Sequence, residues 1–293
     1  MIYLRTAISM DTVTQQRTQV GMIAGTGLLP LYIAEEAIQK GYRVVAIAFP
    51  GFTNPSLERL VNEIHWLKLG QLQKAISILK TSGVARVVMA GKIEKSNLLK
   101  PWKIMPDRRA LKLIRSLEDW RDDTVLSALA NELAQDGIVV DEITTWASNL
   151  MAPLGVLTRK YPTSEQIRDI EFGRTMAQGI GALDIGQTVL VRNLAVIVVE
   201  AIEGTDKAIR RAGDLKLPDC VVVKMAKPCQ DMRFDVPGVG ADTIQSMIAA
   251  RASVLAVEAG KTMISNLDEM ISKANNAGIC VVGIRAKGPI FDF

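Results

Sequence analysis

The stretch QVGMIAGTGLLPLYIAEEAIQKGYRVVAIAF, residues 19–49, decides the fold of the first part of the chain. It begins with a short apolar run and continues into a helical pattern that ends at Gly41. A second apolar run, YRVVAIAF, follows directly. This strand–helix–strand order predicts two parallel strands joined by a right-handed crossover helix.

The same alternation continues to about residue 150, with further apolar runs at ARVVMAG and GIVVDEI. We therefore expect an N-terminal domain at residues 20–155, built as a Rossmann-like parallel sheet with helices on both faces. Residues 1–19 lack the apolar core of a signal peptide, so we expect them to form a flexible N-terminal extension.

A second α/β domain is expected at residues 165–293. QTVLVRNLAVIVVEA (187–201) predicts two strands joined near Arg192, and DCVVVKMA (219–226) predicts another strand. The second and third of these strands are each followed by a turn and a helical pattern, which is typical of an α/β fold.

A linker is predicted between the two domains. The segment APLGVLTRKYPTS (152–164) combines a Gly, two Pro and basic residues, and we place the linker at 156–164. The expected fold class is therefore α/β, with two α/β domains joined by a linker and the active site in the cleft between them.

Composition limits the function. The chain has 293 residues, of which 48% are hydrophobic, and its net charge of +4 is too small to indicate nucleic-acid binding. Three cysteines without CxxC spacing indicate a reduced, cytoplasmic protein rather than a disulfide or zinc protein. With a single histidine, any metal must be held mainly by carboxylates, which favours Mg²⁺ or Mn²⁺. No apolar run reaches the roughly 18 residues of a membrane span.

The glycine loop in GMIAGTGLLP (21–30) follows a predicted strand and opens a helix. Gly25, Thr26 and Gly27 match the start of a dinucleotide fingerprint, but Pro30 stands where the third glycine belongs, which argues against NAD. Backbone N–H groups near a helix N-terminus still suit a phosphate or a nucleotide. We therefore expect these three residues to bind substrate, with a purely structural turn as the alternative.

A basic stretch, KIEKSNLLKPWKIMPDRRALKLIR (92–115), contains eight cations, two acids and several apolar residues. Such a segment fits binding at an anionic membrane surface or contact with an amphiphilic substrate. The alternative is a solvated helix face above a buried apolar stripe. The cations are Lys92, Lys95, Lys100, Lys103, Arg108, Arg109, Lys112 and Arg115.

Two strand-to-helix turns of the second domain are rich in acids, VEAIEGTDKAIRRAG (199–213) and KPCQDMRFDVPGVG (227–240). If the preceding strands are parallel, both turns share the sheet edge where ligands of α/β proteins bind. Thr205 is the expected N-cap of the helix in the first turn. The acids are Glu200, Glu203, Asp206, Asp231 and Asp235, of which the last four are the candidate metal ligands.

Convergence of these four acids would create a Mg²⁺ site suited to phosphoryl transfer, with a carboxylate as proton acceptor. The cations Lys227, Arg233 and Arg210 would then face a polyanionic substrate. Two alternatives remain: Asp206 only complements the helix dipole, and 227–240 is a surface turn.

The stretches AVIVVEAIEGTD and KPCQDMRFDVPGVG, with GMIAGTGLLP near the N-terminus, resemble the LpxI-type UDP-2,3-diacylglucosamine pyrophosphatases. The runs DIGQTVLV (184–191), VLAVEAG (254–260) and WRDDTVLSAL fit the same family. The resemblance covers about residues 20–286. Two departures stand out: Gly238 where the family usually has Thr, and Arg121 where a small residue is usual.

The resemblance implies Mg²⁺-dependent hydrolysis of UDP-2,3-diacylglucosamine to UMP and 2,3-diacylglucosamine 1-phosphate (lipid X), in lipid A biosynthesis. It also implies a peripheral location on the cytoplasmic face of the inner membrane. It points to Asp235 as the essential aspartate, with Asp231 and Arg233 beside it as further catalytic candidates. The expected substrate-binding residues are Gly25, Thr26, Gly27, Lys227, Gln230, Thr205 and Arg210, and the expected metal ligands are Glu203, Asp206, Asp231 and Asp235.

Two other functions remain open from the sequence. One is a soluble phosphohydrolase that acts on a different nucleotide-sugar or diphosphate. The other is a non-catalytic protein that binds a nucleotide or a lipid.

Overall fold

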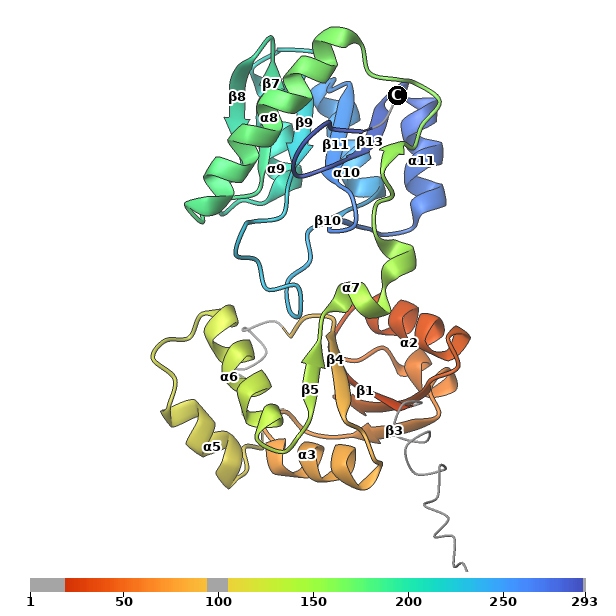
Figure 1. Cartoon of the computed structure of the whole chain (residues 1–293), viewed down its shortest axis with the longest axis vertical. Coiled ribbons are helices and arrows are strands. Elements are labelled where there is room, and N and C mark those ends of the chain that lie inside the picture. The colour runs from red at the N-terminus through yellow and green to blue at the C-terminus, as the bar shows by residue number, and fades with distance from the viewer. Residues whose placement is uncertain (1–18, 94–104, 292–293) are drawn as a thin grey trace, which may run out of the picture. The chain divides into compact units, whose positions relative to one another are not determined.

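The computed structural model describes residues 19–93 and 105–291 of the chain. The chain divides into two compact units, Met1–Ala147 and Ser148–Phe293 (Figure 1). The boundary lies earlier in the sequence than predicted, because Val156 pairs with Val282 in the sheet of the second unit. The Gly- and Pro-containing segment that suggested a linker therefore contributes an edge strand.

The first unit contains a five-stranded sheet in the order β3-β2-β1-β4-β5, and every neighbouring pair is parallel, as predicted. The order reverses between β1 and β4, which lie side by side although β2 and β3 come between them in the sequence. Ligands of such sheets bind at the carboxyl ends of the strands next to this reversal. The strands are β1 (Gln19–Ala24), β2 (Arg43–Ala48), β3 (Glu63–Trp66), β4 (Arg86–Ala90) and β5 (Val139–Asp141).

The helices of the first unit follow the predicted patterns closely. The helical pattern that ends at Gly41 forms a helix at Leu29–Gln39, and the alternation that continues to about residue 150 includes helices at Arg108–Arg115 and Asp122–Ala134. Pro55–Arg59 is a short 3-10 helix of this unit, and Ser148–Leu150, a second one, opens the other unit. The α-helices are α2 (Leu29–Gln39), α3 (Leu72–Thr81), α5 (Arg108–Arg115), α6 (Asp122–Ala134) and α7 (Ile143–Trp146).

The second unit contains a six-stranded mixed sheet in the order β6-β13-β11-β9-β7-β8. The central strands β9, β11 and β13 are parallel, whereas β7 and β8 form the antiparallel hairpin predicted at Arg192. The strands are β6 (Gly155–Val156), β7 (Thr188–Arg192), β8 (Ala195–Val199), β9 (Val221–Lys224), β11 (Val254–Glu258) and β13 (Cys280–Ile284). A separate parallel pair is formed by β10 (Gly238–Val239) and β12 (Met263–Ile264).

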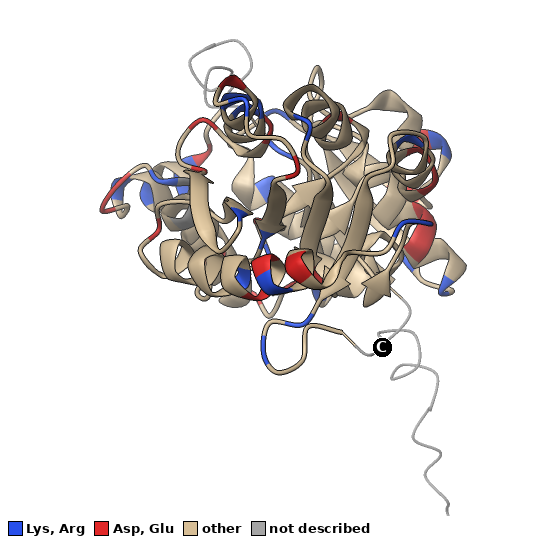
Figure 2. Ribbon diagram, turned by 90° about the horizontal axis from the view of Figure 1, so that it is seen from above, with Lys and Arg blue, Asp and Glu red and all other residues tan. Residues whose placement is uncertain are grey.

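Helices cover both faces of this sheet. One face packs on α8 (Ser164–Ala182), which contributes Ile170 and Ala177 to the core. The other face packs on α9 (Thr205–Asp214), α10 (Ala241–Ala250) and α11 (Leu267–Asn276). In Figure 2 the charged residues lie mainly on helices and loops and the strands are mostly tan, as expected for strands buried on both faces.

The strand directions decide where the functional loops lie. Strand β7 is antiparallel to both β8 and β9, so β8 and β9 point the same way. The carboxyl ends of β8, β9 and β11 therefore share one edge of the second sheet, and the two acid-rich turns both start there. The prediction that these turns lie on the same edge is confirmed.

Candidate active site

A cleft of about 440 Å³ lies at this edge of the second sheet. The first turns of α9 form one side, and the segment that leads into α10 contributes the other side. The two acid-rich turns thus meet in one cleft, although only the last part of 227–240 reaches it. The lining residues are Glu203, Gly204, Thr205, Asp206, Lys207, Arg210, Gly238 and Thr243.

The two acids that line the cleft, Glu203 and Asp206, differ in their hydrogen-bond partners. Glu203 pairs with Arg211 at 2.6 Å, and this hydrogen bond holds the pKa of Glu203 below its usual value. Asp206 lies in the first turn of α9, and its Oδ1 atom is buried with no hydrogen-bond partner among the described residues. The Asp206 Oδ1 atom therefore remains available to coordinate a cation or to accept a hydrogen bond.

The acids of 227–240 are held by their own loop. Asp231 pairs with Arg233 at 2.6 Å, and the guanidinium lowers the pKa of this carboxyl. Asp235 is exposed, and its Oδ2 accepts a hydrogen bond from Nε2 of Gln230 at 2.7 Å. Asp235 is thus the more accessible carboxylate of the two.

The predicted four-acid metal site is not assembled in this structure. Within 19–93 and 105–291, no three His, Cys, Asp or Glu side chains lie close enough together to hold a metal ion. Two carboxylate oxygens near the cleft, Glu200 Oε2 and Asp206 Oδ1, are nevertheless buried without a partner. Unpartnered carboxylate oxygens fit a hard cation such as Mg²⁺.

The predicted phosphate-binding cations also differ from one another. Lys227 pairs with Asp184 at 2.6 Å, and Arg233 is held by Asp231. Arg210 lines the cleft and is exposed, and its side chain makes no ion pair with the described part of the chain. Arg210 is therefore the predicted cation best placed to meet a ligand there.

Lys224, a buried lysine that the sequence did not single out, lies beside the cleft. Lys224, the last residue of β9, is 2% exposed, and its Nζ donates to Thr205 Oγ1 at 2.6 Å. The Thr205 hydroxyl donates in turn to Oε1 of Glu200, also buried, at 2.9 Å. The only signal in the sequence is a lysine and a glutamate that end apolar runs, VVVK and VIVVE.

Thr205 was predicted as the N-cap of α9, and this is wrong. The N-cap is Gly204, whose φ of 83° suits glycine, and Thr205 is the first helical residue. Its hydroxyl faces Lys224 and Glu200 instead of capping the helix.

Glu258 holds the start of the 227–240 loop. It ends β11, is 4% exposed, and accepts a hydrogen bond from the Ala226 N–H at 3.0 Å. Its other oxygen pairs with Lys261 at 3.1 Å. The sequence run VLAVEAG drew attention to this residue only through the family resemblance.

The glycine loop of the first unit lies at the carboxyl ends of β1 and β4, next to the reversal of strand order. The N–H groups of Gly25 and Thr26 donate to the carbonyls of Ala90 and Lys92 at 2.7 and 2.8 Å. A Cβ atom on Gly25 would lie 2.7 Å from the Lys92 carbonyl oxygen, so close approach of the two loops requires glycine. Two of the N–H groups expected to bind phosphate therefore have structural partners, and Gly27, with φ of 90°, completes the turn.

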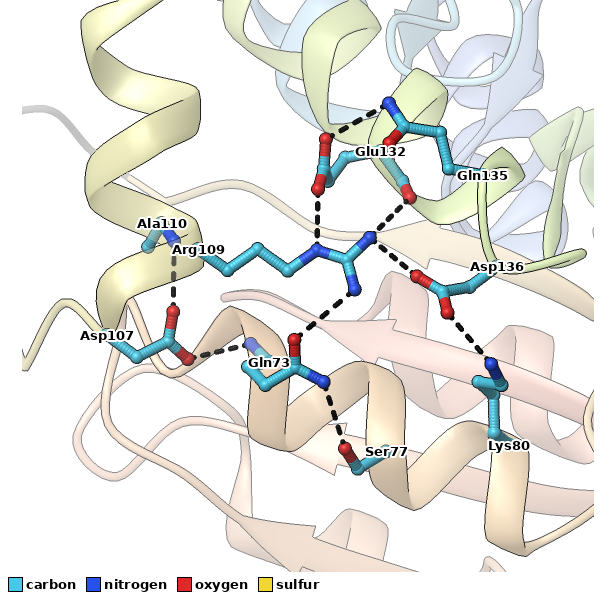
Figure 3. Close-up of polar contacts among 9 residues, drawn as sticks. All are labelled: Gln73, Ser77, Lys80, Asp107, Arg109, Ala110, Glu132, Gln135 and Asp136. Carbon is cyan, nitrogen blue, oxygen red and sulfur yellow. Dashed lines mark hydrogen bonds and ion pairs between the residues drawn. The ribbon is translucent and has the colours of Figure 1, made fainter.

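The described part of the basic stretch contains both a structural and an exposed set of cations; residues 94–104 lie outside the described ranges. Arg109 pairs with Glu132 and Asp136, both at 2.5 Å, and Asp136 also pairs with Lys80 at 2.8 Å (Figure 3). This network ties together α3, α5 and α6. Arg109 therefore has a structural role in the first unit, which neither interpretation of the basic stretch predicted.

The remaining cations of α5 face solvent. Arg108, Lys112 and Arg115 are exposed and lie at i, i+4 and i+7, which places them on one face of the helix. Leu111 and Ile114, each 38% exposed, lie beside them. In the described ranges, no helix is long and apolar enough to cross a membrane.

Comparisons with known proteins match nearly the whole chain to a single family. The LpxI N-terminal domain family matches residues 19–150, and the LpxI C-terminal domain family matches residues 153–282. A Caulobacter vibrioides protein named UDP-2,3-diacylglucosamine pyrophosphatase LpxI is 30% identical over 279 residues, which cover 91% of this chain and 97% of that protein.

Solved structures give only distant similarities. Rhizobium etli pyruvate carboxylase is 13% identical with a TM-score of 0.26, over 65% of this chain and 17% of that one. The biotin carboxylase subunit of a pyruvate carboxylase is 14% identical with a TM-score of 0.25, over 67% and 41%. TM-scores this low carry no argument about the fold or the function.

Proposed function

This chain belongs to the LpxI family, and from that premise we propose that it hydrolyses the diphosphate bond of UDP-2,3-diacylglucosamine. The products are UMP and 2,3-diacylglucosamine 1-phosphate, and the protein is a hydrolase of lipid A biosynthesis. The match to the Caulobacter enzyme over 97% of its length is the observation that carries this proposal.

We assign the chemistry to the cleft of the second unit and to the adjoining loop 227–240, which reaches the cleft at Gly238. Asp235 accepts the proton of the attacking water, because its carboxylate is exposed and held by Gln230 rather than by a cation. Arg210 stabilises negative charge on the diphosphate, because its guanidinium lines the cleft without an acid partner among the described residues. Asp231 and Arg233 hold each other and orient the loop that carries Asp235.

Mg²⁺ is the proposed cofactor, and Mn²⁺ has the same ligand preference. Asp206 is the best ligand, because it lines the cleft and its Oδ1 has no partner in the described ranges. Glu203 lies on the same turn and would have to release Arg211 to join it. When bound, Mg²⁺ neutralises phosphate oxygens and lowers the pKa of a coordinated water.

Product analysis with purified protein tests the reaction. UDP-2,3-diacylglucosamine is expected to give UMP, and Asp235→Asn is expected to lower kcat by about 100-fold or more, as for a lost general base. Asp214→Asn, a surface change at the end of α9, is the matched control and should behave as wild type. Full activity of Asp235→Asn would overturn the role of Asp235, whereas an inactive wild type would overturn the reaction.

The same assay separates this function from its alternatives. Hydrolysis of UDP-sugars without acyl chains at an equal rate would favour a general nucleotide-sugar phosphohydrolase. Binding of UMP without any turnover would favour a non-catalytic protein.

We also propose a peripheral contact with an anionic membrane surface on the cytoplasmic side, where an acylated substrate is accessible. The support is the exposed face of α5, on which Arg108, Lys112 and Arg115 lie beside Leu111 and Ile114. Cations next to partly exposed apolar residues are typical of helices that lie on anionic lipid.

A further inference from the structure

Lys224 is a charged residue in an unusual place. It ends β9, between β11 and β7 in the second sheet, and is 2% exposed. Lysines are almost never this buried unless they are paired, because removing an ammonium group from water is energetically costly. A buried lysine at the edge of the sheet where ligands bind therefore needs a specific reason.

The donor and the acceptor of each hydrogen bond around Lys224 follow from the chemistry of its groups. An ammonium group only donates, so Thr205 Oγ1 must accept from Lys224 Nζ, at 2.6 Å. The single hydroxyl proton of Thr205 then goes to Glu200 Oε1, at 2.9 Å. Thr188 Oγ1, which lies 3.4 Å from Thr205 Oγ1, can in turn only donate to it.

These hydrogen bonds meet at the Thr205 hydroxyl, in the first turn of α9. Gly204, the N-cap, has no side chain that could fix the helix start. The Thr205 hydroxyl, held by Lys224, Glu200 and Thr188, supplies that anchor instead. The residues that follow are the ones that line the cleft, Asp206, Lys207 and Arg210.

We propose that Lys224 is a positioning residue: it acts through Thr205 to hold the first turn of α9, and with it Asp206 and Arg210, in the orientation that catalysis requires. This inference rests on the proposed hydrolysis. Lys224 is 2% exposed and its Nζ donates to Thr205, which lines the cleft, so we expect it to act through the Thr205 hydroxyl rather than on the substrate directly.

Steady-state kinetics on four variants test this role. Thr205→Val keeps the shape of the side chain and removes the hydroxyl, and Lys224→Met keeps the length and removes the charge. We expect each to lower kcat by about 10- to 100-fold, as for a misplaced catalytic group, and to raise KM by no more than the roughly 10-fold expected for loss of Arg210 itself. Thr205→Ser, which keeps the hydroxyl, should stay within about threefold of wild type.

The double variant decides whether Lys224 acts through Thr205. If it does, Lys224→Met with Thr205→Val loses no more kcat than the worse single variant. Losses that multiply would overturn the proposal, and so would a Thr205→Ser variant as slow as Thr205→Val. Circular dichroism and thermal unfolding confirm that each variant is folded.

A readout without substrate keeps this test separate from the proposed reaction. Hydrogen–deuterium exchange of residues 200–210 should be faster in Thr205→Val and Lys224→Met than in wild type and Thr205→Ser, while α8 stays unchanged. Unchanged exchange in all variants would overturn the positioning role. An inactive wild type would overturn only the proposed reaction, since the exchange data would still decide whether Lys224 orders this turn.

Discussion

Asp231 and Asp235 lie four residues apart in one loop but are held by different partners. Asp231 is bonded by the guanidinium of Arg233, whereas Asp235 accepts a neutral amide donor from Gln230. A carboxylate that is already neutralised by a cation is a poor proton acceptor, so the accessible Asp235 is the better base. The sequence alone could not make this distinction, because both acids flank the same arginine.

The ion pair of Asp231 predicts a pH effect. Arg233 lowers the folded pKa of Asp231, so the folded state binds fewer protons than the unfolded state in acid. The stabilisation is therefore present above the unfolded pKa of about 3.9 and is lost as pH falls through the lower folded pKa. In a carboxyl ¹³C NMR titration, Asp231 should titrate below about 3.9 in wild type and at a higher pH in Arg233→Met; equal midpoints would contradict the pairing.

Arg210 predicts a substrate-binding effect. Because its guanidinium lines the cleft without an acid partner in the described ranges, Arg210→Ala should raise KM by about 10-fold, the loss of one charged hydrogen bond. Arg210→Lys keeps the charge and should recover part of this. Arg168→Ala, on α8 at the opposite face of the sheet, is the control and should leave KM unchanged. An unchanged KM in Arg210→Ala would remove Arg210 from the site.

At the scale of elements, the ion-pair network of Figure 3 explains how a strongly basic helix is fixed. Arg109 of α5 reaches Glu132 and Asp136 on and after α6, and Asp107 caps α5 through the Ala110 N–H at 2.9 Å. Asp107 also accepts from the N–H of Gln73 in α3 at 2.7 Å. Three helices are therefore joined by polar contacts rather than by apolar packing alone.

Loss of Arg109 should therefore destabilise the first unit. Arg109→Met is expected to lower the free energy of unfolding by about 1–2 kcal/mol, measured in urea, because Glu132 loses its cation and Asp136 keeps only Lys80. Arg108→Met, the exposed neighbour, is the matched control and should change it by less than about 0.5 kcal/mol. Equal effects of the two changes would contradict a structural role for Arg109.

The elements were largely predictable because apolar runs and helical periods are local properties of the sequence. Strand β1, helix α2 and strand β2 form where QVGMIA, LLPLYIAEEAIQ and RVVAIA predict them. The edge strand β6 was not predicted, because two residues next to prolines give no period and their pairing with β13 depends on the whole fold. The cap of α9 was missed because a glycine with positive φ competes with a threonine whose hydroxyl has a buried partner.

At the scale of the whole molecule, the sequence correctly predicted that two turns lie at one edge of a sheet. It did not predict the buried charged residues that lie at the same edge. Lys224 and Glu258 end β9 and β11, and Glu200 directly follows β8; only the order and direction of the strands bring these residues to a common edge. The four-acid metal site was expected from residue types, but local ion pairs hold Glu203 and Asp231 in this structure. Side-chain pairing of this kind depends on loop geometry that sequence patterns do not reveal.

Membrane contact is a property of the whole molecule and predicts a salt-sensitive association. Wild type should sediment with anionic liposomes at low salt, and Arg108→Gln with Lys112→Gln should weaken binding by about 30-fold, or about 1 kcal/mol per cation. Arg59→Gln with Lys74→Gln removes two exposed cations elsewhere in the first unit and is the matched control. Binding that is absent, or equally weak in both pairs, would contradict a role for α5.

Phosphorus-31 NMR of UDP-2,3-diacylglucosamine with the wild-type protein and Mg²⁺ tests the central claim most directly. The account predicts that the paired diphosphate resonances disappear and that two phosphomonoester resonances replace them, one from UMP and one from 2,3-diacylglucosamine 1-phosphate. Diphosphate resonances that persist with folded protein, or products other than these two phosphomonoesters, would contradict it.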